Sequence, residues 1–129
     1  MEDSEYSKQW NKYLLYMDLY KLFHQMTINA MIFGSAIVGG LFAFYIQNQH
    51  VENAKYILWL LVTILFIASI LSVVSAGTVS LLNKGIKELS MKLEINPYPT
   101  TTPLKYILFS TSVFCSILAI EVFALFFNY

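Results

Sequence analysis

The chain has 129 residues, of which 57% are hydrophobic and only 12% charged, and its formal net charge is zero. A chain of this length forms one domain, and its neutral charge gives no attraction to nucleic acid. The apolar residues are gathered in three long runs, which is typical of an integral membrane protein. We therefore expect residues 1–129 to form a single all-α membrane domain with three transmembrane helices.

Residues 1–21 are predicted to form an amphipathic helix ahead of the first span. Large side chains recur at spacings of four and three, which places them on one stripe: Tyr6, Trp10, Tyr13, Met17 and Tyr20. Such a helix fits the headgroup region of a bilayer. The alternative is a heptad-like seam that packs against sister chains. Because no Pro separates this segment from the span, the two could also form one helix of about 40 residues.

The first span is predicted at residues 26–46, and one broad face of it carries small and polar side chains. At 100° per residue, this face holds His24, Gln25, Asn29, Ser35, Ala36, Gly39, Gly40 and Ala43. Ser35, Gly39 and Ala43 are each four residues apart. Small residues in such a row let a second helix approach closely, so we expect them to be helix-packing positions.

The second span is predicted at residues 56–82, a run of 27 residues without a charge. A single long apolar run crosses a bilayer as a helix, because a helix satisfies its own backbone groups. A second row of small residues follows it at spacings of four: Ala68, Ser72, Ala76 and Ser80. The short polar turn at residues 47–55 predicts that the first two spans are antiparallel neighbours.

Residues 83–105 are expected to form a short cytoplasmic helix and then a link rich in Pro. Pro97, Pro99 and Pro103 end the helix and favour an extended chain, and Thr101 or Thr102 is a suitable cap for the next helix. The third span is predicted at residues 106–127. Its packing face holds Ser112, Cys115, Ser116 and Ala119.

Lysine distribution predicts the orientation in the membrane. Seven of the eight Lys residues lie before the first span or between the second and third, and only Lys55 lies in the loop between the first two. The excess of positive charge marks the cytoplasmic side. We expect a cytoplasmic N-terminus and an external C-terminus, in a bacterial inner membrane.

Four polar side chains within or at the edge of the spans are candidate functional residues: Glu121, Asn29, Gln25 and His24. Glu121 lies on the side of the third span opposite its small residues. Because a carboxylate facing lipid is costly, we expect a second copy of the chain, a partner membrane protein or a water path to cover it. The alternative is that Glu121 is protonated, or that its side chain snorkels outward toward Lys55 and Tyr56.

No constellation in the sequence predicts catalysis. Zinc-ligand spacing, phosphate-binding loops and nucleophile motifs are absent from it, and His24 and His50 fall on opposite sides of the membrane. We expect no enzyme activity, no cofactor and no metal site. The remaining hypotheses are a self-assembling protein that forms a narrow opening or perturbs the bilayer, and a scaffold or accessory subunit of a larger membrane complex.

The layout of residues 5–94 resembles the SLATT-type domains of small membrane effectors in bacterial antiphage systems. The shared order is an amphipathic helix, a span, a short turn, a second span and a cytoplasmic helix. The third span is an addition to that pattern. The resemblance implies an oligomeric, pore-like effector that kills or arrests the cell.

Overall fold

The computed structural model describes residues 2–95 and 102–128, and these form three long helices. They are α1 (Glu2–Gln47), α2 (Lys55–Lys92) and α3 (Thr102–Asn128). No strand occurs in the described ranges, so the all-α expectation is confirmed. Each helix is long and apolar enough to cross a membrane. The chain is therefore described below as a membrane protein.

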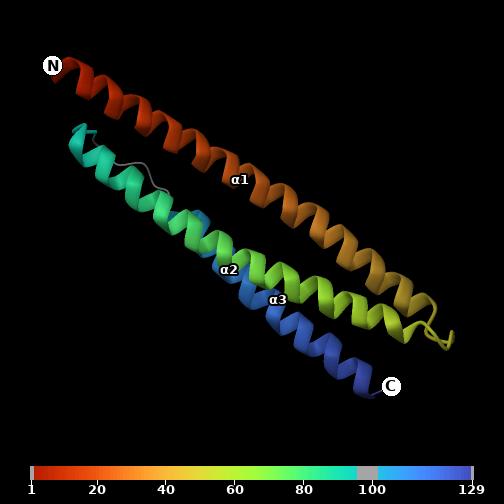
Figure 1. The fold of residues 1–129 in the computed structure, drawn as a ribbon. Helices are drawn as coiled ribbons and strands as arrows, with labels where there is room; N and C mark the ends of the chain where they lie inside the picture. The colour runs from red at the N-terminus through yellow and green to blue at the C-terminus, as the bar shows by residue number, and fades with distance from the viewer. Residues whose placement is uncertain (1, 96–101, 129) are drawn as a thin grey trace.

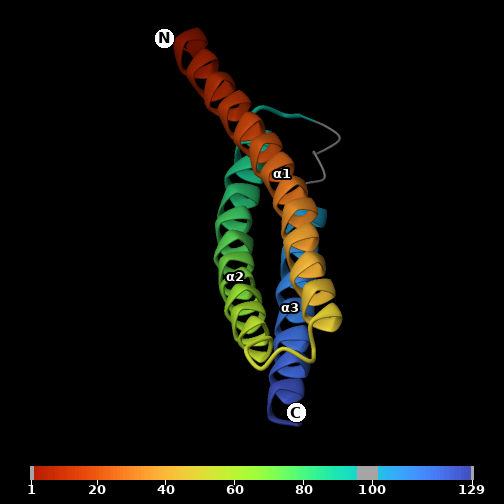
Figure 2. The same ribbon diagram turned by 90° about the vertical axis from the view of Figure 1, so that its right-hand side faces the viewer.

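The three helices form an elongated bundle in which α2 is the central element. α2 packs most extensively against α3 and also against α1, and each neighbour runs antiparallel to it (Figures 1 and 2). α3 starts part of the way along α2, where Lys105 reaches Ser80, and at one end of the bundle lie the N-terminus of α1 and the end of α2. We call this the lysine-rich end, and the opposite end, at residues 48–54, the loop end.

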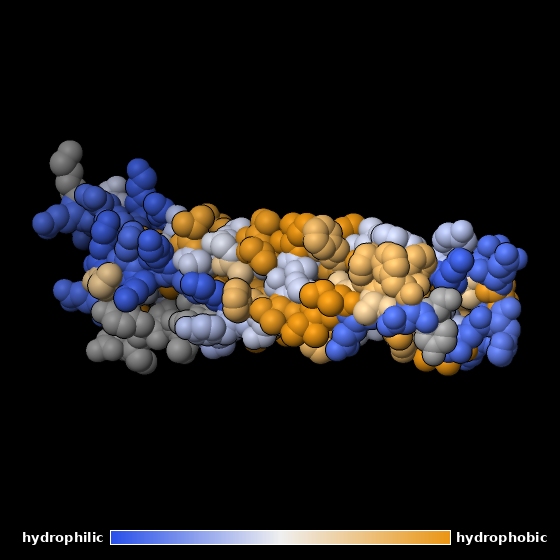
Figure 3. All heavy atoms as spheres, turned by 90° about the horizontal axis from the view of Figure 1, so that it is seen from below, coloured by the Kyte–Doolittle hydropathy of each residue, from blue (hydrophilic) through white to orange (hydrophobic). Residues whose placement is uncertain are grey.

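The surface is divided into an apolar band and two polar ends. Figure 3 shows hydrophobic residues gathered along the middle of the molecule, with hydrophilic residues at both extremities. Many large apolar side chains in this band are exposed, among them Phe33, Phe66 and Ile120 at 68%, 62% and 69%. Surfaces of this kind are stable in lipid, where no hydrophobic driving force acts to bury them.

α1 is one uninterrupted helix of 46 residues. A separate amphipathic helix at residues 1–21 is therefore not confirmed, and the single-helix alternative describes the observed segment. Part of the predicted aromatic stripe packs within the chain: Tyr13, Met17 and Tyr20 contact α2, whereas Tyr6 and Trp10 are exposed. The stripe thus covers an extension of α2 that continues beyond its apolar run.

α2 likewise continues past its apolar run, to Lys92. Its end is closed by two backbone hydrogen bonds, from Ile95 N–H to the Ser90 carbonyl and from Glu94 N–H to the Met91 carbonyl. Glu94 adopts the left-handed conformation, with φ of 55°, as the residue after a helix end commonly does. The predicted roles of Pro97, Pro99 and Thr101 lie outside the described residues.

The extensions of α1 and α2 pack on each other through a cluster of buried side chains: Tyr13, Ile86, Leu89 and Leu93. Gly85 of α2 lies against the Tyr16 ring of α1. A Cβ placed on it would lie 2.6 Å from Cε2 of the Tyr16 ring. A side chain at position 85 would therefore force the two helices or the ring apart.

We expect Gly85→Ala to lower the thermal midpoint of the protein in detergent, because overpacking at such a site costs about 1–3 kcal/mol. Gly77 is the matched control, since nothing lies within 4 Å of its would-be Cβ. Gly77→Ala should be neutral or stabilising by up to about 1 kcal/mol through helix propensity. Circular dichroism on heating measures both variants, and equal midpoints would contradict the close approach.

Candidate functional site

A cluster of three hydroxyls joins α2 to α3 in the middle of the apolar band. The Ser69 Oγ lies 2.8 Å from the Ser116 Oγ and 3.0 Å from the Ser112 Oγ. Ser116 donates to the carbonyl of Ser112 at 2.9 Å. Ser69 and Ser112 are buried. Each polar atom in the cluster thus has a partner inside the band, where an unsatisfied hydroxyl would be costly.

The small residues predicted on α2 and α3 lie at or near this interface. Ala76 and Ser112 are buried, and Ala68, Ser72, Ser80 and Ala119 are half-buried. Ala76 packs with Val79 against Leu104 and Leu108 of α3. Further toward the lysine-rich end, the Lys105 Nζ donates to the Ser80 Oγ at 3.4 Å. Small side chains here allow α2 and α3 to lie close enough for these contacts.

The small residues predicted on α1 lie elsewhere. Ser35, Gly39 and Ala43 are exposed, and nothing lies within 4 Å of a Cβ built on Gly39 or Gly40. α1 contacts the rest of the chain instead through Tyr20, Phe23, Val38, Leu41 and Tyr45. At 100° per residue, these contact residues cover an arc of about 140–200°, and the small ones cover a separate arc of about 260–340°. The face bearing Ser35, Gly39 and Ala43 points outward, and we call it the outer α1 face.

The polar residues near the start of the first span share the outer α1 face. His24, Gln25 and Asn29 are all exposed. The His24 ring stacks on Tyr20, with ring centroids 6.4 Å apart. No side-chain hydrogen bond to Gln25 or Asn29 is present among the described residues. Their amides are thus exposed at the edge of the apolar band.

Glu121 is exposed on the surface of α3 within the apolar band, on the other side of the helix from Ser112 and Ala119. Its depth follows from its neighbour Val122, which packs in a cluster around Leu58, Leu61 and Leu65 of α2. Val38 and Leu41 of α1 pack against the same cluster. Since these two residues flank Gly39, Glu121 and the centre of the outer α1 face lie along the same two turns of α2, from Leu58 to Leu65.

Sequence patterns did not single out two features of the structure. The first is the meeting of Ser69 with Ser116, although the helical positions of both already placed them among small residues. The second is an aromatic cluster at the loop end: Trp59 packs edge to face on Phe126, with ring centroids 5.2 Å apart, and also contacts Phe123. The signal in the sequence was the recurrence of aromatic rings near the end of α3, at Phe123 and Phe126.

No group of three or more His, Cys, Asp or Glu side chains that could hold a metal ion occurs within residues 2–95 and 102–128. The chain matches no protein-family model, no curated protein and no solved structure. Function must therefore be argued from the geometry of the exposed polar positions.

Ser69→Ala removes the hydroxyl that joins the two helices, and we expect a loss of about 0.6 kcal/mol, the average measured for hydrogen bonds between membrane helices, and at most about 1.7 kcal/mol. The expected result is a lower thermal midpoint by circular dichroism. Ser110→Ala is the control, because Ser110 is exposed on α3. A Ser69 variant as stable as the control would show that the hydroxyl cluster contributes nothing to the packing.

Proposed function

We propose that this chain is a membrane protein that assembles with copies of itself through the outer α1 face. One observation carries the proposal: the outer α1 face and the Glu121 side chain are both exposed, along the same two turns of α2 in the apolar band. A carboxylate that faces lipid within the apolar band is unfavourable. A copy whose outer α1 face covers Glu121 would remove that exposure.

The geometry of the two surfaces supports a contact between unlike faces. The open space at Gly39 and Gly40 can accommodate a protruding side chain, and the Ser35 hydroxyl is available to hydrogen bond with a carboxyl group. Because one surface is on α1 and the other on α3, the contact is head to tail. Contacts of this type close into rings when the rotation between copies permits.

A ring built in this way is the basis for a pore-like or membrane-perturbing activity. His24, Gln25 and Asn29 would lie near its lysine-rich mouth, whereas the residues deeper in the band are largely apolar. Any opening would then be narrow or gated rather than a wide aqueous channel. This agrees with the effector activity that the SLATT-like layout implies, and it requires no catalytic group or cofactor.

The alternative function is that of a non-catalytic scaffold or accessory subunit. The exposure of Glu121 favours it, since a different membrane protein could supply the group that covers this carboxyl. In that case α3, rather than α1, would carry the functional surface.

Assembly can be tested by measuring the protein mass of the purified chain in lipid nanodiscs. We expect a discrete oligomer that dissociates on Gly39→Leu, which fills the space at the outer α1 face, and on Glu121→Leu. Glu121→Gln should retain the oligomer, because its amide can still form hydrogen bonds. Gly77→Leu, at an exposed position of α2, is the control. A monomeric wild-type chain would rule out self-assembly and favour the accessory-subunit alternative.

For the orientation, we propose that the lysine-rich end faces the cytoplasm. Single cysteines at positions 8 and 50, in a Cys115→Ala background, should differ in how they are labelled in intact bacterial cells. A membrane-impermeant maleimide is expected to label position 50 and to label position 8 only after lysis. The reverse pattern would overturn the orientation.

A further inference from the structure

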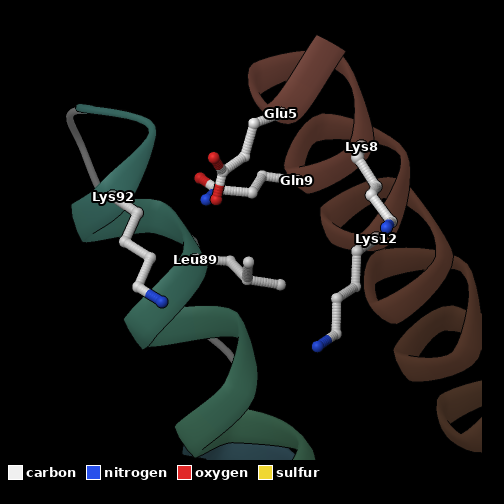
Figure 4. Close-up of a pocket in the computed structure, with 6 residues that line it drawn as sticks. All are labelled: Glu5, Lys8, Gln9, Lys12, Leu89 and Lys92. Atoms are coloured by element: carbon white, nitrogen blue, oxygen red, sulfur yellow. The ribbon is translucent and has the colours of Figure 1, made fainter. Parts of the chain in front are cut away.

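A charged groove lies between α1 and α2 at the lysine-rich end, away from the surfaces considered for assembly. Its volume is about 240 Å³, and six residues line it: Glu5, Lys8, Gln9, Lys12, Leu89 and Lys92. Figure 4 shows Leu89 projecting from α2 toward α1, with Lys92 alongside α2 on one side of it and Lys12 on the side of α1. Glu5 and Gln9 lie together at the outer end of the groove.

The residues that line this groove carry more positive than negative charge, although the extensions of α1 and α2 as a whole (residues 2–25 and 83–95) hold six lysines and six acidic residues. Three ammonium groups and one carboxylate line the groove. Among the described residues, the salt bridge present joins Lys21 to Asp18, which do not line the groove. Lys12 contacts the Tyr16 ring, 5.8 Å from its centroid, which leaves its charge intact. Like charges brought together in this way favour a bound anion.

The height of the groove above the membrane distinguishes a soluble ligand from a lipid headgroup. Lys92 lies ten residues beyond Leu82, the end of the apolar run, and this corresponds to about 15 Å of helix. Lys8 is further out still, about 27 Å before residue 26. The headgroup layer on each side of a bilayer is only about 5–8 Å thick. The groove therefore lies outside the layer in which lipid phosphates are found.

We propose that this groove binds a soluble anion carrying at least two phosphate groups. Lys8 and Lys12 would contact it from α1 and Lys92 from α2, and the Gln9 amide can donate a further hydrogen bond. Lysine ammonium groups are common partners of phosphate. The volume is below the range of about 300–1,000 Å³ typical of drug-sized ligands, which favours a compact anion. Such a ligand would tie the extensions of α1 and α2 together.

Inorganic pyrophosphate is the probe for the test, titrated calorimetrically into the full chain in phosphatidylcholine nanodiscs. We expect saturable binding that weakens at least tenfold in Lys12→Gln/Lys92→Gln. The control is Lys84→Gln/Lys87→Gln, which removes the same charge from exposed lysines of α2 that do not line the groove. This control should stay within twofold of the wild type. Circular dichroism checks that both double variants remain folded.

Two results would overturn the proposal. Absence of saturable pyrophosphate binding, or an equal loss of pyrophosphate affinity in both double variants, would show that the groove contributes only diffuse surface charge. Nanodiscs that contain phosphatidylglycerol test the lipid source: weakening of pyrophosphate binding in the wild type but not in Lys12→Gln/Lys92→Gln would assign the lysines to lipid headgroups. Because these measurements do not depend on oligomer formation, their failure is distinguishable from failure of the assembly proposal.

Discussion

The packing of α2 against two neighbours determines where the other helices lie. α3 follows it through the apolar band, joined by small side chains and the hydroxyls of Ser69, Ser112 and Ser116. α1 follows it as well, with the Tyr16 ring against Gly85 outside the apolar run. In lipid, such contacts depend on close packing and hydrogen bonds rather than on removal of apolar surface from water. The positions of small residues therefore determine the packing of α2 on α3, whereas α1 packs through large side chains such as Phe23 and Leu41.

That dependence explains how much of the fold could be predicted from the sequence. Three helices followed directly from three apolar runs, because a helix is the way for a single run to satisfy its backbone in lipid. The path of the N-terminal segment could not be predicted from these runs. An aromatic stripe containing Tyr13 and Tyr20 suits a bilayer surface and a protein surface equally well. What distinguishes them is a complementary stripe on α2, at Ile86, Leu89 and Leu93, that continues past the membrane.

The candidate site was predictable to a similar degree. Spacing alone identified the rows of small residues, but two rows of the same chemistry have different surroundings. The row with Ser72 and Ala76 lies at or near the contact of α2 with α3, whereas the row with Gly39 points outward. A sequence pattern gives the face of a helix and not its neighbour. The placement of Gly39 and Glu121 along the same two turns of α2 likewise depends on the register of three helices, which only the contacts around Leu61 establish.

The continuity of α1 has a mechanical consequence. Residues 2–33 contain neither Gly nor Pro, so they form a stiff rod of about 48 Å, with Tyr16 resting on Gly85 near its middle. A rod supported in this way acts as a lever. A tilt of about 5° around that fulcrum would move residue 33 by roughly 2 Å, given about 25 Å of helix between them. The glycines at 34, 39 and 40 come directly after the rod, where a helix bends most easily. Movement of α1 at the lysine-rich end would thus displace the turns of α1 that pack along the same stretch of α2 as Glu121's neighbour Val122.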